Sequence, residues 1–169
     1  MRVWALTAAI FVFPLDGSAA LNIQGELAPP PCEILCKGLD KNSEAFWRSA
    51  LPEFYGNPKG LEILNDLAKS GAALPAVIVK SIPESDMDYD YGGRTLYISK
   101  QFLNKNGFRP GDLKEAAKRE EFILMVSPLI LHELVHVRSG ALFPRRHAAN
   151  GLFFEREKQA YAEEMVFIH

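Results

Sequence analysis

The sequence predicts an α+β fold with one domain, in which two short strands lie among several helices. Residues 74–82 and 94–99 are rich in β-branched and aromatic side chains, which is typical of strands. Residues 129–139 would be apolar on nearly every side of a helix, as in a helix buried in the core. The chain has 169 residues, of which 48% are hydrophobic and 24% charged, so one ordinary globular core is expected.

The N-terminal segment, residues 1–20, has the pattern of a secretory signal peptide. Arg2 precedes an apolar stretch over residues 3–13, and small residues fill positions 17–20. The stretch is shorter than the roughly 20 residues of a membrane-spanning helix, and no later segment is expected to be long enough. We therefore expect cleavage after Ala20 or Ala19 and a secreted or periplasmic protein without a membrane anchor. The alternative is a buried N-terminal strand or helix.

Residues 21–31 are predicted to form an extended lead-in tail, because the three prolines that end it favour a polyproline conformation. The folded domain is then expected over residues 32–169. In an oxidising compartment Cys32 and Cys36 can form a disulfide, although it would close only a very short loop. A zinc site made by this pair is disfavoured, because such a site needs further ligands and no histidine is near in the sequence.

Two helices are predicted before the strands. Asn42-Ser43 precedes a short helix over residues 44–50, and Asn57-Pro58 begins a second helix that ends near Gly71. The connection between the strands lacks the glycine and the final glutamate of a calcium-binding loop, so it is predicted to be a solvated loop. It carries three alternating acids: Asp86, Asp88 and Asp90.

The charge of the chain argues against a nucleic-acid partner. The formal net charge is −2, whereas nucleic-acid-binding domains usually carry a concentrated basic surplus. Only Arg145-Arg146-His147 is locally basic, and such a run is typical of a solvated turn.

A buried helix with an uncertain start is predicted after Leu113. Residues 114–126 have helical character, and the pattern resumes over residues 129–139 after Ser127-Pro128. Pro128 can begin a new helix that Ser127 caps, or it can kink one long helix, because proline removes a backbone hydrogen bond. The sequence leaves both alternatives open.

Within this helix lies His132-Glu133-Leu134-Val135-His136, the pattern H-E-x-x-H. Two histidines four residues apart lie one above the other on a helix face, where they can bind one metal ion, and the adjacent glutamate can act on a water molecule. The alternative is a pair of core histidines bonded to backbone carbonyls beside an ion-paired glutamate. Without a metal, that cluster would leave a carboxylate to desolvate at a cost of several kcal/mol.

The third ligand distinguishes families that share this pattern. Ser139 and Leu142 exclude the metzincins, which have glycine and histidine at these places. The later stretch Glu157-Lys158-Gln159-Ala160-Tyr161 resembles the gluzincins, which pair an H-E-x-x-H helix with a second helix carrying E-x-x-A. The resemblance implies a zincin-like fold, with a small mixed sheet whose edge strand, residues 94–99, lies beside the buried active-site helix. It also implies one zinc ion per chain, held by His132, His136 and Glu157.

Helical periodicity favours Glu157 over Glu155 as the third ligand. Glu157 and Glu164 share a face that is otherwise apolar and is expected to face the core: Phe153, Phe154, Ala160, Tyr161, Met165 and Ile168. Glu155 lies instead on a polar side that suits solvent: Lys158, Gln159, Ala162 and Glu163. Glu164 is predicted to accept a hydrogen bond from the free ring nitrogen of a metal-bound histidine.

These residues predict a zinc-dependent endopeptidase that acts on a peptide or protein substrate. Glu133 would be the general base toward the attacking water, and Tyr161 is the candidate hydrogen-bond donor to the oxyanion. An extended peptide is expected to pair with the edge of the strand at residues 94–99. The alternatives are an exported, non-catalytic zinc-binding module for protein interaction, and an enzyme whose cleft is covered by residues 21–31 or by the loop at Arg145.

Overall fold

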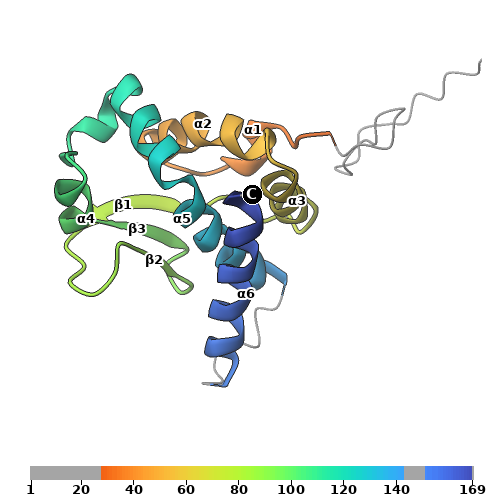
Figure 1. Cartoon of the computed structure of the whole chain (residues 1–169). Helices are drawn as coiled ribbons and strands as arrows, with labels where there is room; N and C mark the ends of the chain where they lie inside the picture. Colours follow the sequence, from red (N-terminus) through yellow and green to blue (C-terminus); the bar gives the residue numbers. More distant parts are fainter. Residues whose placement is uncertain (1–27, 143–150, 169) are drawn as a thin grey trace, which may run out of the picture.

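The computed structural model describes residues 28–142 and 151–168, and it has a small sheet among helices (Figure 1). The class is α+β, as predicted. The predicted signal peptide and the first part of the predicted tail lie outside the described residues. The elements follow in this order: α1 (Cys32–Leu35), α2 (Lys41–Tyr55), α3 (Pro58–Lys69), β1 (Ala76–Lys80), β2 (Met87–Asp90), β3 (Thr95–Ser99), α4 (Lys100–Lys105), the 3-10 helix η1 (Asp112–Lys114), α5 (Ala116–Leu142) and α6 (Gly151–Ile168).

Helix α2 is longer than the predicted segment 44–50. Asp40 caps it by accepting hydrogen bonds from two backbone N–H groups of the first turn, at 2.9 and 3.2 Å. The helix continues through Pro52, which costs about 3 kcal/mol in a helix interior. Leu51 and Phe54 are buried in this last part, and each contributes about 1.5–3 kcal/mol, which offsets the proline. Tertiary packing therefore sets the end of α2.

The sheet contains a strand where a solvated loop was predicted, so that prediction is wrong. Residues 87–90 form β2, which pairs antiparallel with β3, while β1 pairs parallel with β3. Met87 and Tyr89 are buried and Asp88 is exposed. Asp88 and Asp90 are thus on the outward side of a half-buried strand, and Asp86 directly precedes it.

The prediction that residues 94–99 form an edge strand is also wrong. The strand order is β1-β3-β2, so β3 is the central strand and both of its sides are already paired. A peptide cannot pair with β3, because no unpaired backbone edge is left there. The strand that contacts α5 is β2.

Helix α5 decides between the two alternatives for Pro128, because it is one helix from Ala116 to Leu142 with the proline inside. Proline has no N–H for the carbonyl of Leu124, four residues earlier. The Ser127 hydroxyl donates to that same carbonyl at 3.5 Å. The Ser127 hydroxyl therefore partly replaces the backbone hydrogen bond that Pro128 removes.

Helix α5 also corrects the expectation that no later segment is long enough to span a membrane. Ala116–Gly140 is long and apolar enough by length and composition, but 72% of its apolar window is buried inside the protein. In Figure 1 the helix runs obliquely through the centre, and it contacts α2, α3, β2 and α6. It occupies the position of a core helix.

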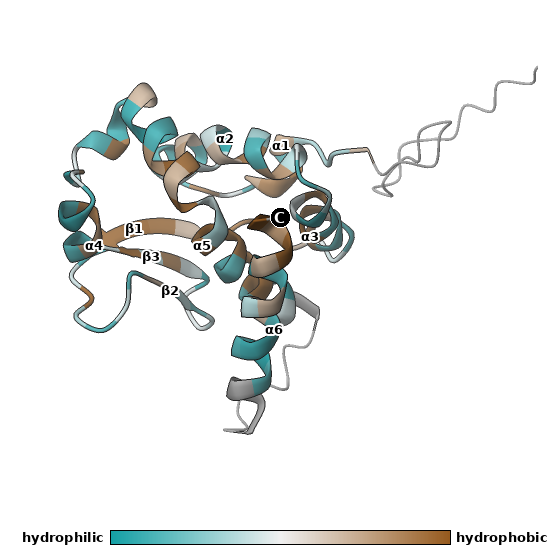
Figure 2. Cartoon of the chain, viewed as in Figure 1, coloured by the Kyte–Doolittle hydropathy of each residue, from teal (hydrophilic) through white to brown (hydrophobic). Residues whose placement is uncertain are grey.

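The hydrophobic core surrounds α5, and the C-terminal end of α6 packs into this core. The largest fully buried side chains include Trp47, Phe54, Leu64 and Phe122, and β1, β3 and the end of α6 are hydrophobic in Figure 2. Phe167 packs on Phe54 with ring centroids 5.6 Å apart, and the Asn57 side chain donates to the Phe167 carbonyl at 3.2 Å. These contacts fix one end of α6 on α2 and on the N-terminus of α3.

Candidate metal centre

Two histidines of α5 face the same point. His132 and His136 are buried, and their Nε2 atoms are 3.2 Å apart. The spacing of four residues places them on one helix face, as predicted. Two Nε2 lone pairs converging at this distance repel each other unless a proton or a cation lies between them.

Glu157 of α6 completes the group. Its Oε2 atom lies 3.3 Å from His132 Nε2, and its Oε1 atom lies 3.1 Å from His136 Nε2. One ligand atom from each residue lies within 4.8 Å of the others, so this group could hold a metal ion. Two imidazole nitrogens and a carboxylate oxygen suit zinc, and three protein ligands leave one position open. The side chain of Glu157 is 28% exposed, so the group is accessible from solvent.

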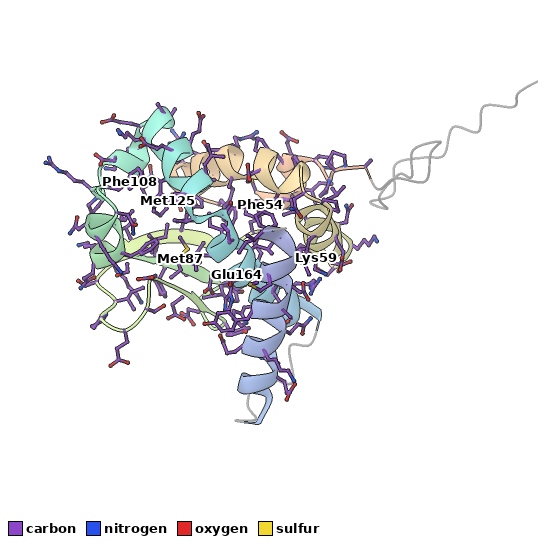
Figure 3. All side chains as sticks on the ribbon, viewed as in Figure 1. Phe54, Lys59, Met87, Phe108, Met125 and Glu164 are labelled. Carbon is purple, nitrogen blue, oxygen red and sulfur yellow. The ribbon has the colours of Figure 1, made fainter. Side chains whose placement is uncertain are left out.

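Glu164 of α6 contacts the other ring nitrogen of His132. Its Oε2 atom lies 3.2 Å from His132 Nδ1, and Figure 3 labels the residue on α6. A hydrogen bond from Nδ1–H to this carboxylate leaves the Nε2 lone pair for a metal ion. Nδ1 of His136 has no such partner among the described residues.

Burial changes the charge states that these residues prefer. Burial lowers the pKa of His136 to about 4, helped by the charges of His132 and Arg156. The neutral imidazole is the form that binds metals. Burial also raises the pKa of Glu133 to about 8, and the carboxylates of Asp88 and Glu157 raise it further, against a hydrogen bond from the Tyr89 backbone. Strand β2 thus contacts the candidate base directly.

Tyr161 contacts the candidate metal centre edge-on through His132, and it is exposed, whereas its side of α6 was expected to face the core. Its ring centroid is 4.6 Å from that of His132, and the residue is 59% exposed. A hydroxyl group in this place is accessible to a substrate.

Tyr91 and Arg156 also flank the centre, and the sequence analysis missed both. The Tyr91 ring lies 6.1 Å from the His136 ring, and the Arg156 guanidinium lies 5.7 Å from the Tyr91 ring centroid. Burial raises the pKa of Tyr91 to about 12, although Arg156 opposes this shift. Adjacency to Glu157 was the one signal for Arg156, and no pattern pointed to Tyr91.

The expected core-facing side of α6 is only partly right. Glu157 faces the histidines and Glu155 is exposed, which is the predicted contrast. Met165 and Ile168 were expected in the core but are exposed, whereas Phe167 is buried. Glu163 was placed on the solvent side but ion-pairs with Arg138 of α5. The helix is rotated toward Phe167 because that ring packs on Phe54.

Comparison with protein-family models, with curated proteins and with solved structures finds no match to this chain.

Proposed function

We propose that the protein is a zinc-dependent peptidase that hydrolyses peptide bonds at the candidate metal centre. The observation that supports this proposal most directly is the meeting of His132, His136 and Glu157 from two helices, with Glu133 buried beside them. A purely structural site needs no adjacent base and usually has a fourth protein ligand. Among the described residues, no fourth residue belongs to the group.

The residues around the group have distinct roles in this proposal. His132, His136 and Glu157 would hold the ion, and Glu164 would orient His132. When bound, zinc supplies Lewis acidity, which polarises a carbonyl group and lowers the pKa of water. Glu133 takes a proton from the attacking water and returns it to the leaving amine. The Tyr161 hydroxyl is the candidate donor to the substrate carbonyl oxygen.

Replacement of the base tests the proposal. Glu133→Gln is expected to keep the fold and zinc binding while peptide hydrolysis falls by about 10²–10⁴-fold, because only proton transfer is removed. Hydrolysis of unfolded protein and of a peptide library is measured together with zinc content. The control is Glu155→Gln, an exposed acid of α6, which should retain wild-type activity.

Two outcomes would contradict the proposal. A wild-type protein that binds no zinc from zinc-containing buffer has no metal centre of this kind. A wild-type protein that binds zinc but cleaves no substrate would favour the non-catalytic zinc-binding module.

A further inference from the structure

Arg138 is a buried arginine just beyond the candidate metal centre. Its side chain is 8% exposed, and it is the only lysine or arginine in the buried class within the described residues. It follows His136 by two residues, so it leaves α5 on nearly the opposite side from the histidine. Burying a guanidinium is costly unless it is paired, so its partners show what the residue does.

The partners of Arg138 come from two other helices. Nη2 donates to both carboxylate oxygens of Glu163 on α6, at 2.5 and 2.7 Å. Nη1 lies 3.3 Å from Glu62 and 3.7 Å from Asp66, both on α3. Lys59 of α3, labelled in Figure 3, lies 3.3 Å from Glu163. We call these five residues the Arg138 cluster, and it joins α3, α5 and α6.

Glu163 is held in its charged form within the cluster. Burial alone would raise its pKa, but hydrogen bonds from Gln159 and Arg138 and the charges of Arg138 and Lys59 lower it below the usual range. The side chain is 13% exposed and has four close hydrogen-bond or ion-pair contacts, to Arg138, Gln159 and Lys59. Its position is therefore closely defined.

The cluster holds α6 on a different side of the helix from the one that faces the histidines. Glu163 and Glu164 are adjacent, so their side chains point about 100° apart around the helix. Glu164 contacts His132, while Glu163 contacts Arg138. A helix held at both places cannot rotate about its axis. A rotation of one residue, about 100°, would turn Glu157 away from the two Nε2 atoms.

We infer that the ion pair of Arg138 with Glu163 positions α6. In this position Glu157 and Glu164 of α6 meet the histidines of α5, and the inference rests on the proposed zinc site. Arg138 and Glu163 are positioning residues and do not bind the metal themselves. A buried ion pair adds little net stability, because desolvation offsets the attraction, and a hydrophobic pair of similar volume often replaces it without loss. Zinc affinity and folding stability should therefore respond differently to its removal.

The double variant Arg138→Met with Glu163→Leu tests this inference on the full chain. Its unfolding temperature without metal should equal or exceed that of the wild type. Its dissociation constant for zinc, measured by competition with a chelator, should rise by about 10- to 100-fold, the usual loss when a ligand is no longer oriented. The control is Arg119→Met on the same helix, because Arg119 donates to Ser49 of α2 at 3.0 Å and should leave zinc affinity unchanged.

A second variant covers the case in which the double variant does not fold. Glu163→Gln keeps the volume of the side chain and removes its charge, and it should weaken zinc binding by about tenfold. Amide hydrogen exchange of α6, measured without metal, should become faster in either variant. Wild-type zinc affinity and wild-type exchange of α6 in these variants would overturn the inference. A wild-type protein that binds no zinc would instead contradict the proposed function, and the exchange comparison would still test the Arg138 cluster.

Discussion

Glu133 and His136 lie next to the same centre, and burial shifts their pKa values in opposite directions. Both shifts favour the neutral form, because removal from water penalises charge. For His136 the neutral form is ready to bind a metal ion. For Glu133 the neutral form is the carboxylic acid, so with a pKa of about 8 the group must lose its proton before it can act as a base. Burial therefore prepares His136 as a ligand and keeps a proton on Glu133.

The pH dependence of stability follows from these shifts in chelated protein. The pKa of Glu133 rises from 4.5 to about 8, so its stabilising effect is complete below pH 4.5 and is lost as the pH rises to 8. The pKa of His136 falls from 6.5 to about 4, so its effect is complete above pH 6.5 and is lost toward pH 4. The two nearly cancel between pH 4.5 and 6.5. Of these two groups only Glu133 still titrates above pH 6.5, and its titration should lower the free energy of unfolding by about 2 kcal/mol up to about pH 8.

Urea denaturation at a series of pH values with chelator present measures this fall. Glu133→Gln should remove this fall above pH 6.5, because the variant lacks the titrating carboxyl group. An equal fall in the variant would show that Glu133 is not its source.

Glu157 and Glu155 should contribute differently to zinc binding. Glu157→Ala removes a ligand and should weaken zinc binding by more than the roughly 10- to 100-fold that follows the loss of an orienting partner. Glu155→Ala should bind zinc like the wild type, because that side chain is exposed. Competition titration with a chelator measures the zinc affinity of both variants and shows which glutamate is the ligand. Loss of zinc binding in Glu155→Ala alone would show that Glu155, and not Glu157, is the third ligand.

At the scale of elements, side-chain chemistry explains where the helices follow the sequence and where they depart from it. The start of α3 at Asn57-Pro58 is confirmed, because the Asn57 side chain accepts from the N–H groups of Lys59 and Gly60. Helix α5 passes Pro128 with the help of Ser127, a pair that had indicated either a break or a kink. Local rules therefore located the cap of α3 but not that of α2, which is Asp40, and they cannot weigh a lost hydrogen bond against burial elsewhere.

Helix α1 gives a prediction about the thiols. Cys32 and Cys36 have their sulfur atoms 3.2 Å apart, and Cys32 is only partly buried. Glutathione disulfide should oxidise the pair to an intramolecular disulfide, with loss of two hydrogen atoms detected by mass spectrometry. The gain in unfolding temperature should be small, because the closed loop is very short. Cys32→Ser is the control, and two free thiols that persist in the wild type after oxidation would refute the prediction.

The whole molecule brings together residues that no local pattern joins. Three helices meet at Arg138, and β2 contacts Glu133, which lies on α5. The candidate metal centre is the point at which α5 and α6 share ligands. Metal binding should therefore stabilise the entire fold and not only the local helices.

Removal of the metal tests this linkage. Zinc in about 100-fold excess over its dissociation constant should raise the free energy of unfolding by about 2.7 kcal/mol. A chelator should lower the unfolding temperature accordingly, as measured by circular dichroism at a series of zinc concentrations. Glu157→Ala is the matched control, since its unfolding temperature should depend much less on zinc than that of the wild type. Independence of zinc in the wild type would contradict the prediction.

The sequence by itself determined the α+β class, the one-turn spacing of His132 and His136, and the contrast between Glu157 and Glu155, because these follow from local periodicity. Only the tertiary structure decided that β3 is central, that Asp88 belongs to a strand, and that Glu163 faces Arg138. Strand order and helix rotation depend on contacts between distant segments. Lys59 of α3, which ion-pairs with Glu163, lies about a hundred residues earlier in the chain, beyond the reach of any helical or strand period.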